Sequence, residues 1–270
     1  MRIKFNGKDF DTEVKHSLDF FKSLSKDESD VFIVNGFATK ENIELKEGDE
    51  LFCISKKQMP SKEELRAMIR ARHTPKLYDS LENACVAVCG LGGLGSHIAI
   101  NLARSGVGKL HLIDFDVVEP SNLNRQAYSI DDLGKLKTEA MKEQLAKINP
   151  FIEVKISTLK IEKEDIKELF INDDIVCEAF DNAYYKAMLA QNFHLFFKDK
   201  ILISASGLAG YGASNLIKTR QIAKNFFVCG DLVSAAEVGR GLIAPRVSIC
   251  AAHQANLVLE LLANKEYKDC

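Results

Sequence analysis

The sequence predicts an α/β fold in which a mostly parallel sheet carries helices on both faces and follows a small, mainly β domain. Between residues 84 and 205, short apolar runs alternate with segments of helical periodicity, as in chains of repeated strand and helix units. A glycine-rich turn joins the first apolar run to the first helical segment. Residues 1–57 differ, because apolar and charged residues alternate there around two Asn-Gly pairs, which are typical of hairpins.

The small domain is expected to have the element order ββαββ. Asn6-Gly7 predicts a tight hairpin turn between its first two strands. Ser17 can cap a short helix, and β-rich runs follow over residues 31–34 and 51–54. Because a unit of 57 residues has a thin core, we expect it to depend on its neighbour in the chain.

Residues 1–57 resemble the β-grasp, ubiquitin-like sulfur carriers such as ThiS. The resemblance rests on the opening strand with its Asn-Gly turn and on "KEGDE", residues 46–50, before the last strand. Such carriers end in a flexible Gly-Gly, whose terminal carboxylate is the reacting group. Here the chain continues through Ser55-Lys-Lys-Gln-Met-Pro60 without a glycine pair. We therefore expect a ThiS-like β-grasp domain that lacks the Gly-Gly tail and does not itself act as a carrier.

A linker helix is expected over residues 58–80. Ser61 and Glu64 follow Pro60 at the spacing of a capping box, in which each side chain accepts a hydrogen bond from the backbone of the other. Pro75 is expected to end this helix. The main domain is then predicted over residues 81–270.

In the main domain each predicted strand is followed by a predicted helix. Strands are expected over residues 84–89, 109–114, 152–157, 174–178 and 201–205, and helices over 95–105, 136–147, 163–170 and 183–197. Parallel strands end at one edge of their sheet, and ligands of such sheets bind at that edge. We therefore expect the glycine turn, Asp114, Asp181 and residues 204–212 to gather there.

The glycine turn, Gly90-Leu-Gly92-Gly93-Leu-Gly95, has the form of a nucleotide-binding turn. Its first glycine permits the tight turn, its second lets a phosphate approach the backbone, and its third lets helix and strand pack closely. The helix then presents free N–H groups to the phosphate. Asp114 lies about 20 residues further on, where an acid can bond ribose hydroxyls. These features do not distinguish NAD from ATP.

The charged residues near the strand ends favour ATP. Hydride transfer needs a flat apolar slot, whereas this chain directs Arg125, one or two lysines and two or three aspartates to one edge. Such charges suit a triphosphate attacked at its α-phosphorus, because cations and carboxylate-bound Mg²⁺ stabilise the charge on departing pyrophosphate. The pattern therefore indicates adenylation. Asp116 has two interpretations, a contact to the nucleotide or a cap of the following turn.

Residues 81–265 resemble the ThiF/MoeB branch of the ubiquitin-activating enzyme superfamily. The resemblance rests on "GLGGLGSHIAINLARSGVGKLHLIDFDVVEPSNLNRQ", which starts at Gly90, and on "GKLKTEA", "INP", "AFDNA" and "APRVSICAAHQA" further along the chain. It implies a Rossmann-like adenylyltransferase that uses ATP and Mg²⁺. The segments "SGLAGYG" and "APRV" are most similar to ThiF-like members, which are usually assigned to thiamine biosynthesis.

The resemblance also implies roles for single residues. They are a glycine loop around the nucleotide, an aspartate on the ribose, three residues on the phosphates and an aspartate on Mg²⁺. In that order, these residues are Gly90, Gly92, Gly93 and Gly95; Asp114; Asn122, Arg125 and Lys137; and Asp181. Lys135 stays an alternative to Lys137, because the stretch after Arg125 is one residue shorter than in relatives.

Three further expectations come from the resemblance. Family members form homodimers in which an arginine crosses the interface, and here Arg72, or Arg70, is the matching residue. Some members use a cysteine in the crossover loop, for which Cys229 is the candidate. Many carry zinc on two CxxC pairs, which this chain lacks, so no zinc is expected.

Composition excludes several classes of function. The formal net charge of −2 provides no overall field that would attract nucleic acid or an anionic membrane. No apolar run approaches the roughly 18 residues that span a bilayer, and the first residues lack the apolar core of a signal peptide. The seven cysteines are scattered, which does not suit a disulfide framework. We therefore expect a cytoplasmic protein with neither nucleic acid nor membrane as partner.

The function expected from these observations is ATP-dependent adenylation of the C-terminal carboxylate of a separate, Gly-Gly-terminated sulfur carrier. Pyrophosphate is the other product, and the activated carrier would supply sulfur for the thiamine thiazole. One alternative is adenylation of another carboxylate, as in relatives that act on modified tRNA nucleosides or peptide C-termini. Another is a non-catalytic, nucleotide-binding scaffold that holds a carrier.

Overall fold

The structure is a computed structural model that describes residues 1–24, 30–55, 59–73 and 75–264. The chain divides into two compact units, Met1–Ser80 and Leu81–Cys270. The predicted domain boundary between residues 57 and 58 lies outside the described residues, as does Cys270.

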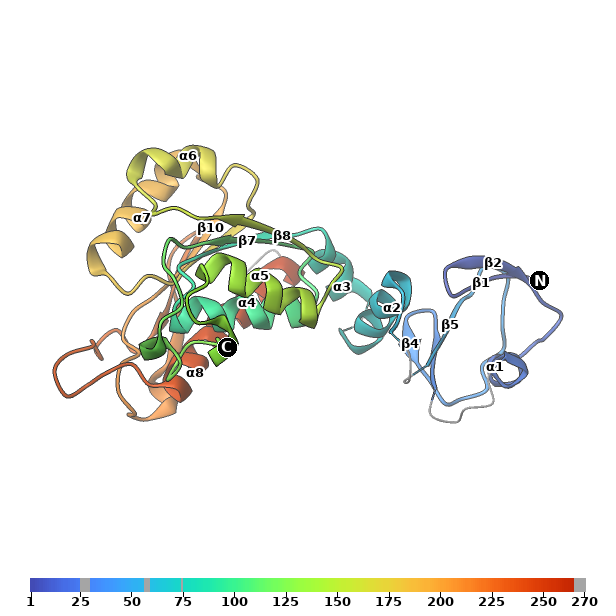
Figure 1. The fold of residues 1–270 in the computed structure, drawn as a ribbon. Helices are drawn as coiled ribbons and strands as arrows, with labels where there is room; N and C mark the ends of the chain where they lie inside the picture. Colours follow the sequence, from blue (N-terminus) through green and yellow to red (C-terminus); the bar gives the residue numbers. More distant parts are fainter. Residues whose placement is uncertain (25–29, 56–58, 74, 265–270) are drawn as a thin grey trace. The chain divides into compact units, whose positions relative to one another are not determined.

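The first unit is a small mixed sheet with its strands in the order β2-β1-β5-β3-β4 (Figure 1). Its elements are β1 (Arg2–Phe5), β2 (Lys8–Asp11), α1 (Ser17–Leu24), β3 (Val31–Val34), β4 (Phe37–Ala38), β5 (Glu50–Ile54) and α2 (Lys62–His73). Strands β1 and β5 are parallel and the other neighbours antiparallel. Positive φ angles at Asn6 (47°) and Gly7 (78°) confirm the first hairpin turn. The second Asn-Gly pair adds β4, a strand that the expected order ββαββ lacks.

Two apolar clusters lie on opposite faces of this small sheet, because neighbouring strand residues point to opposite sides. One cluster packs Phe20 and Phe21 of α1 against Leu51. The other packs Ala67 of α2 against Phe52. The capping box is confirmed, since Ser61 N donates to Glu64 Oε2 (2.9 Å) and Glu64 N to Ser61 Oγ (3.2 Å). The predicted linker helix thus packs on the small sheet.

The described helical residues of the predicted linker are Lys62–His73, in α2, and Pro75–Glu82, labelled α3. Residue 74 between them lies outside the described residues, so the end of a helix at Pro75 stays a prediction.

The second unit contains a seven-stranded sheet in the order β11-β12-β10-β9-β6-β7-β8. Its strands are β6 (Cys85–Cys89), β7 (Lys109–Ile113), β8 (Glu153–Ser157), β9 (Ile175–Glu178), β10 (Ile201–Ala205), β11 (Lys218–Ala223) and β12 (Phe226–Gly230). Every pair of neighbours is parallel except β11 with β12. The predicted α/β class with a mostly parallel sheet is confirmed.

Helices cover both faces of this sheet (Figure 1). They are α4 (Gly93–Ser105), α5 (Lys137–Ile148), α6 (Ile166–Leu169), α7 (Ala183–Phe196) and α8 (Ala244–Asn264). Helices α4, α5 and α8 share one face, and α6 and α7 cover the other. On the second face Phe170 and Phe193 pack edge to face, with ring centroids 5.8 Å apart. The strand order places the ends of β10, β9, β6 and β7 side by side.

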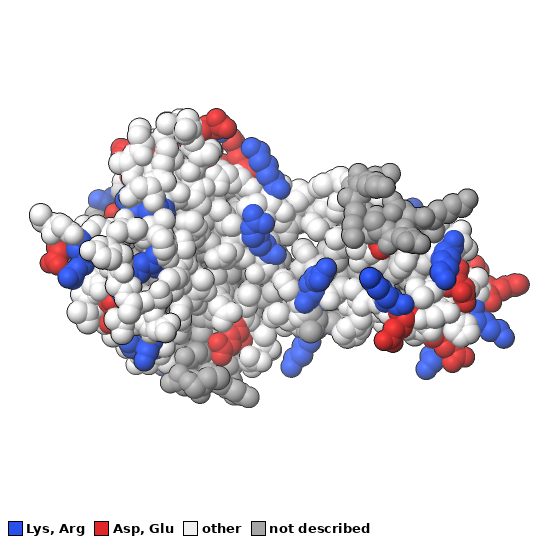
Figure 2. Space-filling view, turned by 90° about the horizontal axis from the view of Figure 1, so that it is seen from below, with Lys and Arg blue, Asp and Glu red and all other residues white. Residues whose placement is uncertain are grey.

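Figure 2 shows one face of the molecule, on which acidic and basic side chains lie dispersed among uncharged ones. Among the described helices, none has the length and apolar character needed to cross a lipid bilayer.

Candidate active site

The glycine turn joins β6 to α4 through two close backbone approaches. Gly90 has a φ of 87°, and a Cβ there would lie 2.9 Å from the carbonyl oxygen of Ala179. A Cβ on Gly95 would collide with the carbonyl oxygen of Gly90. Gly92 is open, since the nearest atom to a Cβ there would be Gln126 Nε2, 3.9 Å away. Two glycines therefore shape the turn and a third leaves room for a ligand.

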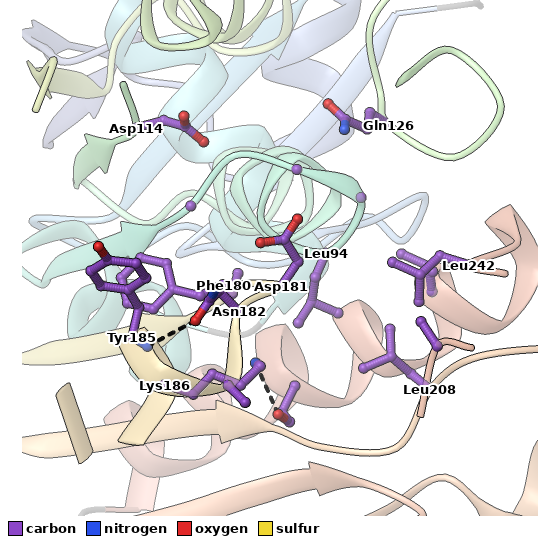
Figure 3. Close-up of a pocket in the computed structure, with 18 of the residues that line it drawn as sticks. Leu94, Asp114, Gln126, Phe180, Asp181, Asn182, Tyr185, Lys186, Leu208 and Leu242 are labelled. Carbon is purple, nitrogen blue, oxygen red and sulfur yellow. Dashed lines mark hydrogen bonds between the residues drawn. The ribbon is translucent and has the colours of Figure 1, made fainter. Parts of the chain in front are cut away.

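A cavity of about 690 Å³ opens at this turn, a volume typical of a small-molecule site (Figure 3). It lies where β6, β7, β9 and β10 end. The predicted site residues that line it are Gly90, Gly92, Gly93, Asp114, Arg125, Lys137 and Asp181. Gly95, Asn122 and Arg72 are not among the lining residues.

Asp114 is fixed against the glycine turn. Its Oδ2 accepts a hydrogen bond from Leu91 N (2.6 Å) and its Oδ1 one from Asp116 N (2.8 Å). The side chain is 8% exposed, so its carboxylate is ordered before any ligand arrives. This is a suitable acceptor for sugar hydroxyls at the edge of the turn.

Lys137 lines the cavity and Lys135 does not. Lys137 is the first residue of α5, and its Nζ donates to Asp116 Oδ2 at 2.9 Å. Its side chain is only 7% exposed. Lys135 Nζ instead pairs with Glu143 Oε2 at 2.6 Å, with both side chains exposed. Of the two alternatives, the structure brings Lys137 to the predicted site.

Arg125 reaches the cavity from the 3₁₀ turn Pro120–Asn122, which Asn122 holds in place. Asn122 Oδ1 accepts from Glu119 N (3.0 Å), and its backbone carbonyl accepts from Arg125 N (3.1 Å). Arg125 Nη1 donates to the Ser121 carbonyl (3.1 Å), while its buried Nε has no partner among the described residues. Asn122 is thus buried under the turn that presents Arg125.

Asp181 follows β9 on the cavity rim and is exposed. Within the described part of the chain its carboxylate has no hydrogen-bond or ion-pair partner. The next residue, Asn182, caps α7, because its Oδ1 accepts from Tyr184 N at 2.9 Å. Among the described residues no group of three or more His, Cys, Asp or Glu could hold a metal ion. Mg²⁺ usually takes one or two carboxylates together with phosphate oxygens, so the free Asp181 carboxylate fits it.

The cavity has two unlike ends. The aromatic end consists of Phe115, which follows β7, Leu159 and Ile161, which follow β8, and Phe180 and Tyr185, which follow β9. The small-residue end follows β10 and β12 and consists of Ser206–Ala209, Ser234–Ala236 and Leu242. In Figure 3, Asp181 lies between Tyr185 of the aromatic end and Leu208 of the small-residue end. A flat ring suits the first end and a thin, extended group the second.

Gln126 and Lys186 also line the cavity, although neither is predicted from the sequence. Gln126 is 8% exposed, and its Oε1 has no partner among the described residues. Lys186 Nζ donates to Glu178 Oε1 (2.8 Å) and to the Ala205 carbonyl (3.0 Å). No signal in the sequence distinguishes Lys186 from a lysine on the outer face of α7.

The structure contradicts the placement of Cys229 in a loop. This residue is fully buried in β12, and burial raises the pKa of its thiol to about 11. A reactive thiol needs exposure and a lowered pKa, so Cys229 is unsuited to attack an adenylate. Arg72 is exposed on α2 of the first unit, and its role across a dimer stays a prediction.

Two family models match the chain. The model of the ThiF family matches residues 65–269, and that of ThiS-like ubiquitin matches residues 1–57. The chain belongs to the ThiF family. Its first 57 residues are a ThiS-like domain, as the resemblance implies.

Several ThiF-family relatives are adenylyltransferases by name. The molybdopterin-synthase adenylyltransferase of Salmonella typhimurium is 30% identical over 69% of this chain and 76% of its own length. The probable adenylyltransferase/sulfurtransferase MoeZ of Mycobacterium tuberculosis is 38% identical over 38% of this chain, which spans only 26% of MoeZ. The match to ubiquitin-like modifier-activating enzyme 5 of Caenorhabditis briggsae, at 30% identity, spans 43% of that enzyme.

Solved structures share the fold. The Escherichia coli tRNA N6-threonylcarbamoyladenosine dehydratase TcdA, in complex with AMP, has a TM-score of 0.68 at 20% identity over 77% of this chain and 98% of its own. Escherichia coli MccB with ATP has a TM-score of 0.56 at 26% identity, over 74% of this chain and 62% of its own.

Proposed function

We propose that this protein adenylates the C-terminal carboxylate of a separate, Gly-Gly-terminated sulfur carrier, with Mg·ATP as the nucleotide. One observation carries the proposal. A single cavity joins the glycine turn and three charged groups, those of Arg125, Lys137 and Asp181, to an end walled by small residues. ATP and the carboxylate substrate of an adenylation can therefore bind on opposite sides of those charges.

In the proposed reaction a carboxylate oxygen of the carrier attacks the α-phosphorus of ATP. The new bond joins that oxygen to phosphorus, and the bond from the α-phosphorus to the bridging oxygen of pyrophosphate breaks. Negative charge develops on the α-phosphate oxygens and on the departing pyrophosphate. Lys137, Arg125 and the free N–H groups of α4 are the groups of this chain that can stabilise it.

Mg²⁺ bound through Asp181 would neutralise further phosphate charge. Lys137 already faces Asp116, and its side chain is nearly buried. The cation is therefore held in one place before ATP binds, so that little reorganisation is needed during the reaction.

The small-residue end supports a carrier tail as the second substrate. A Gly-Gly tail has no side chains, so it fits between segments that have almost none themselves, such as Gly207 and Ala235. Its recognition would come from backbone hydrogen bonds, as in other extended peptides.

The pathway and the assembly rest on similarity. The ThiS-like domain and the "SGLAGYG" and "APRV" segments support a role in thiamine thiazole formation. We further propose a cytoplasmic homodimer in which Arg72 of one copy reaches the nucleotide of the other.

ATP–pyrophosphate exchange with a panel of Gly-Gly carriers tests the function. We expect exchange that depends on one carrier and is abolished by Asp181→Ala. Asp199→Ala is the matched control, because this exposed aspartate lies outside the cavity. Exchange that survives Asp181→Ala would remove Asp181 from the metal site.

A second candidate is activation of another carboxylate. The tRNA threonylcarbamoyladenosine dehydratase of Bacillus subtilis is 38% identical over 48% of this chain, and TcdA shares the fold. Exchange with a modified tRNA but with no carrier would favour this candidate. ATP binding without any exchange would favour a scaffold.

A further inference from the structure

A buried ion pair lies behind the small-residue end of the cavity. Arg246, in the first turn of α8, is 3% exposed, and its Nη2 donates to Asp231 Oδ2. Neither side chain is among the residues that line the cavity. Replacing a buried ion pair with apolar residues is often neutral or stabilising, so stability alone does not account for this one.

Asp231 binds Ser234–Ala236, one of two segments that line the small-residue end. Its Oδ1 accepts hydrogen bonds from Val233 N (2.8 Å) and Ser234 N (2.7 Å), and its Oδ2 accepts one from Ser234 Oγ (2.6 Å). These bonds fix the backbone on which Ser234–Ala236 lie. Because the carboxylate also faces Arg246, the position of this segment depends on the pair.

Asp231 also binds Ser206–Ala209, the other segment that lines this end. Asp231 N donates to the Gly207 carbonyl (2.9 Å), and Leu232 N donates to the Ser206 carbonyl (3.0 Å). A Cβ on Gly207 would collide with Asp231 Oδ1, so Asp231 packs directly on that glycine. Arg246 Nη1 completes the arrangement by donating to the Ala213 carbonyl (3.0 Å).

Small side chains cannot hold these two segments by packing. The wall of the small-residue end is formed by glycine, alanine and serine together with Leu208 and Leu242. Buried apolar area, which normally fixes a loop, is therefore scarce here. The ion pair and its hydrogen bonds supply the missing constraint.

We propose that Asp231 and Arg246 are positioning residues that set the backbone geometry of the wall against which the carboxylate substrate lies. The inference rests on the proposed function for the identity of that substrate. Without the pair, the backbone donors and acceptors of the wall would be less ordered, and an extended tail would lose its hydrogen-bond partners. The nucleotide elements, including Asp114 and Lys137, make no hydrogen bond or ion pair to either residue in the described structure.

Arg246→Gln tests the proposal. We expect the KM for the carrier to rise by at least about tenfold in pyrophosphate exchange, while the KM for ATP changes by less than about twofold. Amide hydrogen exchange should accelerate at Val233 and Ser234 and around Gly207. Arg246→Lys keeps the positive charge, but its single ammonium replaces the two-armed contact to Asp231 and Ala213, so an intermediate KM is expected.

Arg240→Gln is the matched control. Arg240 pairs with Glu237 at 3.3 Å in the same loop, with both side chains about half exposed, and lines no part of the cavity. Its removal should leave the carrier KM within about twofold of wild type. A carrier KM that rises equally in both variants, or an ATP KM that rises as much as the carrier KM, would overturn the proposal.

Different results would refute the proposed function and the positioning role of Asp231 and Arg246. A wild-type protein that shows no exchange with any carrier refutes the proposed function. Amide exchange still decides the positioning role, because it needs no carrier. If the two wall segments keep wild-type protection in both Arg246→Gln and Asp231→Asn, the pair does not position them.

Discussion

Lys135 and Lys137 lie two residues apart in the chain, yet their surroundings differ completely. The ammonium of Lys137 is nearly buried beside Asp116 in the cavity wall, and that of Lys135 is on the surface beside Glu143. An exposed pair contributes little to stability or binding, whereas a cation in a partly dry site can stabilise developing charge strongly.

We therefore expect Lys137→Met to lower kcat/KM in pyrophosphate exchange by about a hundredfold, a typical loss for a fixed charge at a reacting phosphate. Lys135→Met is its control and should stay within about twofold of wild type. The measurement is the exchange rate at several ATP concentrations. An equal loss in both variants would show that the exchange rate depends on the net charge of the protein and not on the position of the lysine.

Asp231 gives a prediction for stability against pH. Burial raises the pKa of its carboxyl, but hydrogen bonds from Ser234 and Val233 and the charge of Arg246 outweigh burial and lower the pKa to about 2. A carboxyl with a lowered pKa in the folded state stabilises that state fully above its unfolded pKa of about 4. That contribution is lost as the pH falls from about 4 towards 2.

The difference in Tm between wild type and Asp231→Asn should therefore be constant between pH 5 and pH 8, and should shrink below about pH 4. Thermal unfolding followed by circular dichroism measures it. Asp199→Asn, at an exposed aspartate, should match wild type throughout. A difference that persists unchanged to pH 2.5 would mean that the ionised carboxylate is not the stabilising form.

Single residues differed in how far the sequence could predict them. Arg125, Lys137 and Asp181 follow predicted strand ends, and strand ends meet at one edge in a parallel sheet, so their gathering in one cavity followed from topology. Asn122 does not reach the cavity, because its side chain closes the turn on which it lies. Gln126 and Lys186 are ordinary polar residues by type, and only packing shows that they face inward.

At the scale of elements, the glycines of the turn between β6 and α4 have different structural roles. The position of Gly95 leaves no space for a Cβ, because the Gly90 carbonyl occupies it, whereas the space at Gly92 is open towards the cavity. One glycine should therefore be needed for folding and the other for binding.

We expect Gly95→Ala to cost about 1–3 kcal/mol of unfolding free energy, the usual effect of overpacking, and so to lower Tm by several degrees. Gly92→Ala should leave Tm nearly unchanged but weaken ATP binding by about tenfold, because its methyl group occupies the approach of a phosphate. Thermal unfolding and calorimetric titration with ATP separate the two effects. Similar losses of Tm in both variants would contradict this division.

Elements with clear periodicity were predicted well. The first five strands of the second unit agree with the expected ranges to within a residue or so at either end. Strands β11 and β12 were not predicted. Strand β11 is an edge strand whose polar sequence, starting at Lys218, lacks alternation of apolar and polar residues, and without it β12 and Cys229 were assigned to a loop.

At the scale of the whole molecule, every residue that lines the described cavity comes from the second unit. ATP affinity should therefore not need the ThiS-like domain. Deleting residues 1–57 is expected to leave the Kd for ATP within about threefold of wild type, as measured by calorimetry.

A second deletion, of residues 1–80, also removes Arg72. It therefore tests the role of Arg72 in ATP binding separately from that of the ThiS-like domain. If Arg72 acts on the nucleotide of a partner copy, ATP affinity falls in this variant and in Arg72→Ala but not after the shorter deletion. A large loss after the shorter deletion alone would contradict an independent nucleotide site. An unchanged affinity for carrier in both deletions would show that the ThiS-like domain takes no part in carrier binding.

The segment where a carrier would have its free tail leads here into α2, which packs on the small sheet. The chain then continues into the second unit, so the ThiS-like domain stays tethered to that unit. A tethered domain has an effective concentration that short linkers set in the millimolar range, whatever the concentration of the protein. Any competition between this domain and a free carrier would be intramolecular, so dilution would not relieve it and only an excess of carrier would.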